Sequence, residues 1–577
     1  MKSLLTILTI IVLAINICYS QPPITLQIMG TDYKDIPEPF GATNLFQSDF
    51  EIHIALKEYI SALNEKGYLS ASLDSISGDS VLQTAYIFYG SKYEWAHLNT
   101  DSVDEEILSR TGFRNKQFLD KPFSVKQVSN FFQDALNYLE NTGYPFAEIK
   151  LANIEMDSNE ISATVVLKKN RFFLIDSVEI LGEDTRLSSS YIQNIIGIKA
   201  KQPYNEEIVK KISQRISENP FMSESKPYEV IFTENDCKLI LLLEPKKSNT
   251  FDGIIGVQPQ DNEGVIITGD IKFSIGNIVG QGERLKLRWQ RIQDETQQID
   301  LSFNIPFLFK TPIGVGYDLN IYRRDTTFNN VHHRLTIPYR ISNGTEFHGF
   351  IDNFTTSLIS VTDYENATDI PPYNDAENQL FGIGFEGQFV QNKLNPYKGW
   401  TLSLNGGAGK NKLIKNPALE QINYDSVILE SSLLQGDIIC SFFQPVTKQT
   451  TLLLRGNVAT KQTDNLVDNQ AYRIGGLLSL RGFDEQSIYA SSYVIGTIEY
   501  RLLFDKFSRI SIFYDWSWYE LNSISKFVSD TPYAFGAGIT FGTKAGLFSL
   551  NYAIGSQFNN PINFRTGKIH FGFVNVF

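Results

Sequence analysis

The stretch RLKLRWQRIQDETQQIDLSFNI, residues 284–305, decides how the second half of this chain folds. An apolar residue stands at every second position in both halves of the stretch: Leu285, Leu287 and Trp289, then Ile299, Leu301, Phe303 and Ile305. The residues between them are polar or charged and include Lys286, Arg288, Gln290, Asp300 and Asn304. A period of two places each set on its own face of a β-strand. The stretch therefore predicts two strands, each with one apolar and one polar face.

The composition of the polar face distinguishes between two kinds of β-sheet protein. In a water-soluble sandwich the apolar face is buried against a second sheet, whereas in a membrane barrel it contacts lipid and the polar face lines the lumen. Here the second face is too polar to belong to a closed core. Aromatic residues also recur near strand ends, where the girdles of membrane barrels lie. The pattern favours a transmembrane β-barrel.

The same alternation continues to the C-terminus and gives roughly sixteen strands between residues 248 and 577, about 20 residues for each strand and connection. Tight connections are expected near 276–281, 306–311, 341–345, 443–449 and 504–508, and long ones near 356–378, 411–426 and 461–491. Because short turns of such barrels face the periplasm, the residues before the first strand are expected on that side.

Residues 21–247 follow a different pattern, in which helices and strands alternate in three copies with a period near 75 residues. The change to continuous strands falls at a polar joint, Lys246 to Asn249. We expect three small α+β modules at residues 21–92, 93–170 and 171–247, followed by the barrel at 248–577.

Each module is predicted to contain a helix with one apolar face. In the first module this face consists of Ile52, Leu56, Tyr59 and Leu63. In the second, Ser124 and Gln127 form a capping-box pattern, and the face consists of Val125, Val128, Phe132, Ala135, Leu136 and Leu139. In the third, a helix after Asn205 is carried by Ile208, Ile212 and Ile216. Gly-Tyr pairs at 67–68 and 143–144 end the first two helices.

The first twenty residues have the pattern of an export signal. Lys2 supplies the positive start, an apolar run extends from Leu4 to Ile17, and small residues precede a cut before Gln21. The run is shorter than the roughly 20 apolar residues that a membrane-spanning helix needs. We therefore expect a signal peptide at residues 1–20.

Composition excludes several classes of function. The net charge of −13 argues against a nucleic-acid partner, because phosphate binding needs a basic face. Beyond the signal only Cys237 and Cys440 remain, which predicts no disulfide framework, and we expect both to be packing residues. The six histidines show no metal-ligand spacing. No nucleophile–base pairing or phosphate loop stands out, so we expect no enzyme, metal or cofactor.

A glycine-rich motif near the C-terminus resembles a known family. Residues 475–483, GGLLSLRGF, are similar to the long-loop motif of the BamA/TamA superfamily of outer-membrane barrel-assembly and translocation proteins. The three modules resemble its periplasmic POTRA modules. Residues 498–501 and 513–517 are similar to strands that follow the loop, as are residues 536–538 and 546–553, although Ser517 stands where the family has glycine. The resemblance implies tandem POTRA modules and a 16-stranded barrel, nearest to the TamA type.

The loop motif has a physical interpretation of its own. A loop of about 30 residues is entropically loose unless something ties it down. Arg481 can form a forked, charge-assisted pair with a carboxylate in the lumen, for which Glu499 and Asp515 are candidates. The resemblance points to Asp515 as the main partner. Gly482 permits a sharp bend and Phe483 can pack on the barrel wall, so we expect these five residues to tether the loop.

The resemblance implies that the protein handles client polypeptides, either nascent outer-membrane barrels or secreted chains, at the outer membrane with its modules in the periplasm. The first and last strands contain glycines, which weaken strand pairing, so a seam that opens to a client strand is expected between them. The predicted seam residues are Phe251, Gly253, Val257, Gly572, Phe573 and Phe577. The expected partners are client chains, the lipid bilayer and, for the TamA type, an inner-membrane-anchored periplasmic protein.

Two alternatives stay open at this point. A two-partner secretion transporter, which exports a dedicated passenger, typically has a plug helix followed by two modules, whereas here the signal is followed by a strand-like segment, Ile24 to Met29. A plain porin needs neither modules nor the loop motif. Barrel assembly is therefore the preferred interpretation, and the secretion transporter is the alternative.

Overall fold

The computed structural model describes residues 23–32 and 45–574, except for short segments at 115, 117, 119–120, 184, 235, 261–263, 294–295, 343, 393–394, 426 and 544–545. The described side chains also exclude those of residues 252–268, 292–293, 342, 546–547, 566 and 571–574. The predicted signal peptide at residues 1–20 lies outside the described residues.

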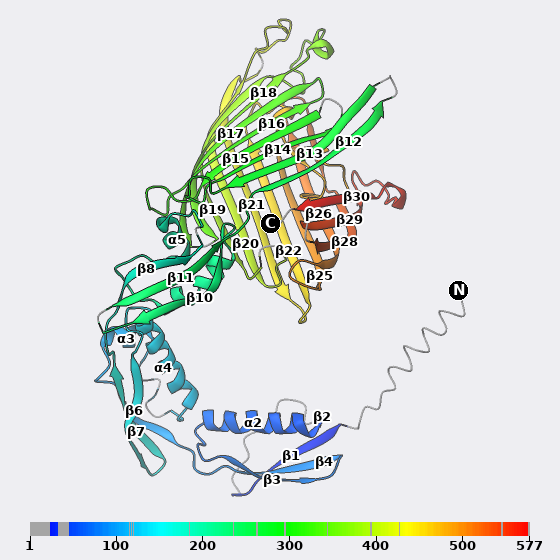
Figure 1. The fold of residues 1–577 in the computed structure, drawn as a ribbon. Coiled ribbons are helices and arrows are strands. Elements are labelled where there is room, and N and C mark those ends of the chain that lie inside the picture. The colour runs from blue at the N-terminus through cyan, green and yellow to red at the C-terminus, as the bar shows by residue number, and fades with distance from the viewer. Residues whose placement is uncertain are drawn as a thin grey trace. The chain divides into compact units, whose positions relative to one another are not determined.

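The chain divides into two compact units (Figure 1). The first consists of Met1–Ser177, Ala200–Lys210 and Phe232–Cys237, and the second consists of Val178–Lys199, Lys211–Ile231 and Lys238–Phe577. The predicted bounds of the three modules differ from this division, which passes through the third module, and those bounds stay predictions.

The first small sheet has the strand order β2-β1-β4-β3 and carries one long helix. Its elements are β1 Ile24–Gly30, β2 Leu45–Phe46, α2 Asp49–Glu65, β3 Ser72–Gly78 and β4 Leu82–Phe88. Helix α2 begins where the Ser48 side chain accepts a hydrogen bond from the backbone N–H of Glu51. The predicted helix face is confirmed, since all four of its residues are buried against the sheet.

The second small sheet has the order β5-β7-β6. Its elements are β5 Glu94–Asn99, α3 Glu105–Arg110, α4 Val125–Glu140, β6 Glu148–Asp157 and β7 Glu160–Lys168. Ser124 caps α4 as predicted, but part of the predicted face was wrong: Val125 is 53% exposed, and Phe131 is buried more fully than Phe132. The buried stripe keeps a spacing of three or four residues, which brings Phe131 to its centre and leaves Val125 beside it in the first turn.

The third small sheet has the order β10-β11-β8-β9. Its elements are β8 Leu174–Gly182, α5 Ser189–Ile196, β9 Gln202–Pro203, α6 Glu206–Lys210, α7 Ile212–Ser217, β10 Met222–Phe232 and β11 Cys237–Pro245. The predicted single helix after Asn205 is divided at Lys211 into α6 and α7. Cys237 is buried, as expected for a packing residue, and its burial together with the nearby Asp176 carboxylate raises the pKa of the thiol to about 11. The same prediction was wrong for Cys440, which is exposed because it shares the outer face of its strand with the exposed Ile438 and Phe442. No described helix is long and apolar enough to cross a membrane.

The second half of the chain forms one antiparallel sheet that curves into a barrel (Figure 1). Its sixteen long strands are β12 Thr250–Gln260, β13 Gly264–Gly276, β14 Arg284–Gln293, β15 Thr296–Ile305, β16 Val315–Arg324, β17 Phe328–Ser342, β18 Thr345–Leu358, β19 Ala376–Val390, β20 Gly399–Leu413, β21 Glu430–Pro445, β22 Thr450–Gln462, β25 Ser492–Leu503, β26 Arg509–Asn522, β28 Tyr533–Thr543, β29 Gly546–Ser556 and β30 Lys568–Val574. A seventeenth, β27 Phe527–Asp530, pairs only with the end of β26. The predicted fold class, small α+β modules followed by a 16-stranded transmembrane barrel, is confirmed.

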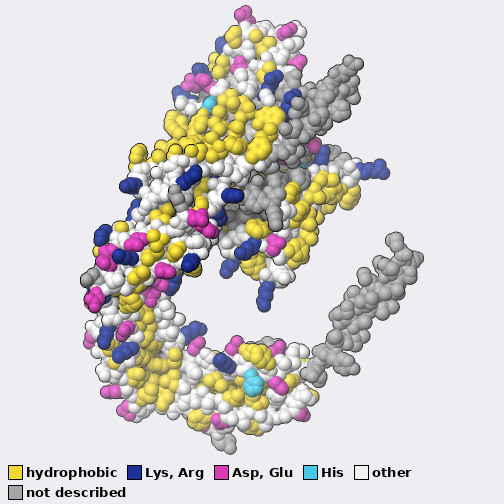
Figure 2. All heavy atoms as spheres, in the orientation of Figure 1, with side chains coloured by type: hydrophobic (Ala, Val, Ile, Leu, Met, Phe, Trp, Pro, Cys, Tyr) yellow, Lys and Arg dark blue, Asp and Glu magenta, His cyan; other side chains and the backbone are white. Residues whose placement is uncertain are grey.

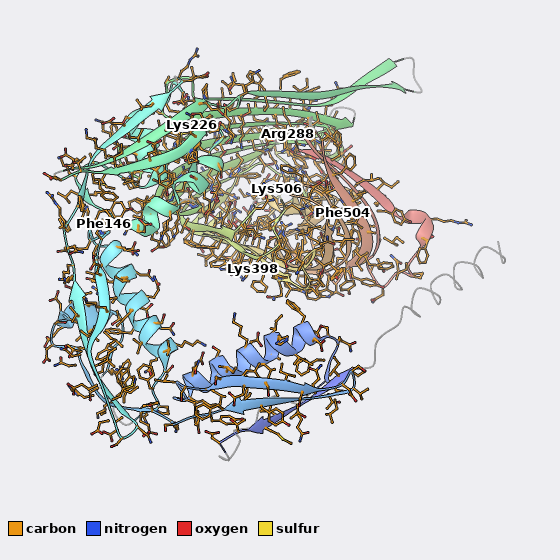
Figure 3. The ribbon with its side chains drawn as sticks, turned by 60° about the horizontal axis from the view of Figure 1, so that its bottom comes forward. Phe146, Lys226, Arg288, Lys398, Phe504 and Lys506 are labelled. Atoms are coloured by element: carbon orange, nitrogen blue, oxygen red, sulfur yellow. The ribbon has the colours of Figure 1, made fainter. Side chains whose placement is uncertain are left out.

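The strand register carries the sequence pattern onto two faces of this sheet. Leu287 of β14 lies opposite Leu301 of β15, and Arg288 lies opposite Asp300. Large apolar side chains on many of the strands are exposed and form a hydrophobic surface on the barrel (Figure 2). On the other face Arg288, whose position is marked in Figure 3, makes a forked pair with Asp270 at 3.1 and 2.9 Å. The apolar set therefore faces lipid and the polar set faces the lumen.

Candidate functional site

The loop between β22 and β25, residues 463–491, has a defined structure. It contains a short 3-10 helix, η3 Asp468–Gln470, and a two-stranded hairpin, β23 Tyr472–Ile474 with β24 Ile488–Ala490. The hairpin presents residues 475–487, which include the motif 475–483, at its tip. Leu480, Phe483 and Ile488 pack in one apolar cluster with Ile495 and Tyr519 of the barrel wall. The predicted long connection near 461–491 is thus present and is packed against the barrel.

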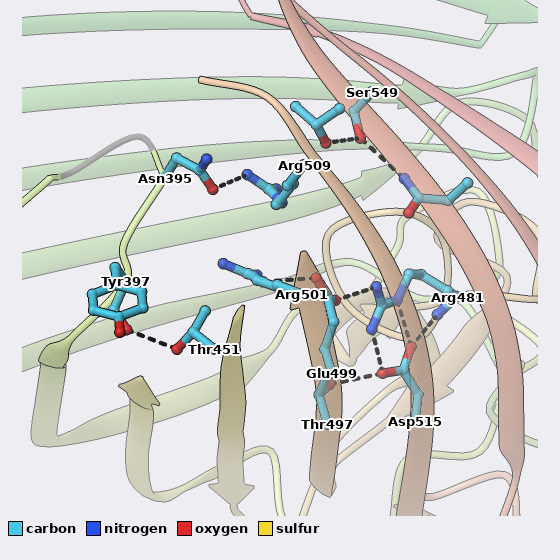
Figure 4. A network of polar contacts seen from close by, with 12 residues as sticks. Asn395, Tyr397, Thr451, Arg481, Thr497, Glu499, Arg501, Arg509, Asp515 and Ser549 are labelled. Carbon is cyan, nitrogen blue, oxygen red and sulfur yellow. Dashed lines mark hydrogen bonds and ion pairs between the residues drawn. The ribbon is translucent and has the colours of Figure 1, made fainter. Parts of the chain in front are cut away.

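Arg481 lies between the carboxylates of Glu499 and Asp515, the two partners predicted for it from the sequence (Figure 4). Its Nε and Nη2 donate hydrogen bonds to Oδ2 and Oδ1 of Asp515, both at 2.7 Å. Its Nη1 donates to Oε2 of Glu499 at 2.7 Å. The guanidinium also lies 3.4 Å from the centre of the Phe513 ring. Strands β25 and β26 therefore hold this arginine through two acidic side chains and an aromatic face.

Two neighbouring side chains donate further hydrogen bonds to Asp515 and Glu499. Thr497 donates to Oδ1 of Asp515 at 2.8 Å, and Arg501 donates to Oε1 of Glu499 at 2.8 Å. The Arg481 side chain is 11% exposed, and those of Glu499 and Asp515 are 6% and 0% exposed. A buried ion pair is tolerated only when its hydrogen-bonding capacity is used, as it is here. Ser517, at the position where the resemblance predicts glycine, is fully buried on β26, and its Oγ has no hydrogen-bond partner among the described residues.

Gly482 and Phe483 place the loop tip against the last strands. Gly482 has φ +86°, and a Cβ at this position would lie 2.9 Å from the backbone nitrogen of Gly555 and 3.0 Å from Cβ of Ala534. The backbone therefore needs glycine both for its left-handed conformation and for its close approach to β28 and β29. The ring of Phe483 occupies the space that a Cβ on Gly555 would need.

The loop tip also contacts β30, which sequence reasoning missed. The backbone N–H of Gly482 donates to Nε2 of His570 at 3.0 Å, and Lys568 forms an ion pair with Asp484 at 2.7 Å. The Lys568 and Asp484 side chains are 40% and 71% exposed, so the ion pair contributes little by itself. The contact with His570 nevertheless joins the arginine motif to the last strand of the barrel.

A second set of contacts, also missed, anchors the start of the loop on another part of the wall. Asn465, Asn469 and Gln470 are at most 2% exposed. Gln470 donates to the side-chain oxygens of Asn378 and Asn411, both at 2.7 Å, and Asn469 donates to Thr356 at 2.7 Å. Asn411 in turn donates to Asn465 at 2.8 Å. The loop is thus held to β18, β19 and β20 by amides and to β25 and β26 by charges.

The predicted seam residues lie on the two end strands of the barrel sheet. Phe251, Gly253 and Val257 belong to β12, which pairs with β13. Gly572 and Phe573 belong to β30, which pairs with β29, and Phe577 lies outside the described residues. Among the strand residues that the structure describes, no backbone pairing joins β12 to β30. The structure therefore brings the five tether residues together, whereas the described backbone of β12 and β30 shows no pairing between the two sets of seam residues.

Within the described part of the chain, no group of three or more histidine, cysteine, aspartate or glutamate side chains is arranged to hold a metal ion. The fold and the loop define a membrane β-barrel with small α+β modules before it and a long loop fixed inside it. The Omp85 superfamily domain matches residues 277–577, which is more than half of the chain, and the protein belongs to the Omp85 superfamily.

Solved structures share this fold. CdiB from Escherichia coli is 14% identical, with a TM-score of 0.51 over 90% of this chain and 96% of that one. CdiB from Acinetobacter baumannii is 14% identical, with a TM-score of 0.50 over 84% and 89%. BamA from Haemophilus ducreyi lacking POTRA domains 1-3 is also 14% identical, with a TM-score of 0.44 over 84% and 99%. At this identity the likeness shows the fold alone. No curated protein sequence matches the chain.

Proposed function

We propose that this protein assembles other β-barrels in the outer membrane without enzymatic chemistry. Client polypeptides are received by the small modules on the periplasmic side and added, strand by strand, at the seam between β12 and β30. The observation that carries the proposal is the loop 463–491, which is fixed by Arg481 to the wall and reaches β30 through His570. A passive pore needs no such element.

The chemistry of the seam follows from its backbone. An unpaired N–H or C=O group in the lipid core costs several kcal/mol unless it finds a partner. Strand β12 includes Gly253 and Gly256, and β30 includes Gly572, and glycine weakens the pairing of the strand that contains it. A client strand that pairs with either edge satisfies these groups by β-augmentation. The outer strands of the small sheets, such as β3 and β6, offer similar edges to clients in the periplasm.

The TamA type is the form of assembly factor that the three modules favour, and it implies an inner-membrane-anchored periplasmic partner. The alternative is a two-partner secretion transporter with one dedicated passenger. Residues 24–30 form strand β1 in the first of three small sheets, whereas a two-partner secretion transporter typically has two modules. The three small sheets support assembly over dedicated secretion.

The proposal is tested by depleting the protein in its own host and quantifying the proteins of the outer membrane and the culture medium. We expect the levels of several outer-membrane barrels to fall while the medium stays unchanged. Loss of one secreted protein with the barrels intact would show that the protein is a dedicated secretion transporter. A matched strain that re-expresses the full chain controls for indirect effects of depletion.

A further inference from the structure

A cavity of about 300 Å³ lies within the second unit, where α5 and α7 meet the start of β14. Four of its lining residues are basic: Arg215, Arg284, Lys286 and Arg340. Glu218 is the one acidic residue among those that line it in the described structure. The cavity is therefore strongly basic in a protein whose net charge is −13.

One wall of the cavity forms where the β13–β14 turn packs against the start of α5. The backbone N–H of Ser188 donates to the carbonyl of Gly280 at 2.8 Å. A Cβ on Gly282 would lie 2.0 Å from the Tyr191 ring, so this glycine allows the ring to lie directly on the turn. Tyr191 also packs edge-on against Phe307, with ring centres 5.7 Å apart. The backbone of the turn that leads into Arg284 is therefore held in place by packing beside the cavity.

Arg284 and Lys286 have no carboxylate partner within salt-bridge distance in the described part of the chain. They lie two residues apart on the lumen face of β14, where Arg284 is opposite Asn304 and Lys286 is opposite Ser302. On the other side Lys286 lies opposite Ser274, whose buried Oγ has no hydrogen-bond partner in the described structure.

The acidic side chain of the β13–β14 turn, Glu283, already accepts hydrogen bonds from the turn itself. Glu283 accepts hydrogen bonds from the backbone N–H groups of Val279 and Gln281, at 2.8 and 3.1 Å. Further along the same face, Arg288 has its own carboxylate, Asp270, at 2.9 Å. Arg284 is half-buried and Lys286 is exposed, and two neighbouring cations of like charge repel each other. An anion from outside the chain would remove this cost.

We propose that this cavity binds a carboxylate of an acidic polypeptide segment. The inference rests on the proposed function, because it names the chemistry of the client. Arg284 and Lys286 supply charge-assisted donors, while Ser302 and Asn304 supply neutral ones. The rings of Tyr191 and Phe221 provide an apolar wall for the side chain next to the carboxylate. Because β14 turns Leu285 and Leu287 to the lipid face, the two cations face the aqueous lumen, where a polypeptide rather than a membrane lipid is the available ligand.

The test uses the full chain in uncharged detergent micelles and a rhodamine-labelled peptide of alternating glutamate and leucine. Fluorescence anisotropy at low salt measures its Kd, and the same peptide with glutamine in place of glutamate measures the contribution of charge. We expect the glutamine peptide to bind at least about tenfold more weakly, the scale of one lost charge-assisted hydrogen bond. The double variant R284Q/K286Q should bind the glutamate and glutamine peptides with the same Kd.

Two further variants keep the test decisive. K410Q/K412Q removes the same charge from exposed lysines elsewhere on the barrel and should bind like the wild type, and R284K, which keeps the charge, should retain most of the preference for glutamate. Equal binding of both peptides by the wild type, or unchanged binding by R284Q/K286Q, would overturn the proposal. Binding of phosphatidylglycerol vesicles that needs Arg284 and Lys286, without peptide binding, would also overturn it and assign a lipid phosphate. Because this assay needs no assembly activity, its failure is distinct from failure of the depletion experiment.

Discussion

Replacing Arg481 with alanine is expected to destabilise the folded barrel by about 3–5 kcal/mol, the cost of removing one partner from a buried ion pair. The substitution removes the guanidinium that contacts both the Asp515 and the Glu499 side chains, which are 0% and 6% exposed, and Glu499 keeps Arg501 as its partner. The loop 463–491 should then separate from β25 and β26. The folded protein in detergent should unfold at a lower temperature or urea concentration, and trypsin should cut within the loop.

Two further variants show whether the forked geometry of the Arg481 guanidinium, and not only its positive charge, stabilises the folded barrel. Arg481→Lys keeps the positive charge but lacks the planar fork that matches the two Asp515 oxygens while a third N–H reaches Glu499, so its stability should lie between those of the wild type and Arg481→Ala. Lys506→Ala removes an exposed cation from the β25–β26 turn and should behave like the wild type. If Arg481→Ala were as stable and as resistant to trypsin as Lys506→Ala, the loop would not be tethered through this residue.

Locking the seam is expected to reduce assembly by at least about tenfold, because a client strand cannot pair with edges that are covalently joined. Cysteine at position 253 of β12 can be combined in turn with cysteine at 572, 573 or 574 of β30, in a chain with Cys237 and Cys440 replaced by serine. The recovery of outer-membrane barrels in depleted cells measures activity. Reduction of the disulfide should restore it.

A disulfide at another strand pair is the matched control. The side-chain oxygens of Thr460 on β22 and Ser492 on β25 lie 2.9 Å apart, so cysteines at these two positions can be joined without moving the strands. This disulfide should leave assembly unchanged. Full activity of a chain that is completely cross-linked between β12 and β30 would rule out the seam as the site of client insertion.

The barrel and the charged tether could be predicted from the sequence because both leave a local signal. Strand alternation is a property of neighbouring residues, so the pattern at 284–305 predicts which face meets lipid. Arg481 was singled out by its motif, and the lumen strands offered Glu499 and Asp515 as the available carboxylates. The structure brings all three side chains into direct contact.

The remaining parts of the site depend on residues that are distant in sequence. Asn465, Asn469 and Gln470 have the composition of an exposed loop, and they are buried because strands β18 to β20 supply amides and hydroxyls to meet them. His570 had no local signal either, since its contact with Gly482 exists only once the barrel brings the loop to β30. In the third module, the eight-residue helix α5 was too short for its periodicity to be recognised.

The most direct test of barrel assembly is to reconstitute the purified full chain in liposomes and to add an unfolded outer-membrane barrel. Its folding can be followed by the shift in gel mobility between unheated and heated samples. We expect liposomes with this protein to fold the client several times faster than empty liposomes, and the chain locked between β12 and β30 to lose this acceleration until it is reduced. Equal folding rates with the protein, with its locked form and with empty liposomes would show that the protein does not assemble barrels at this seam.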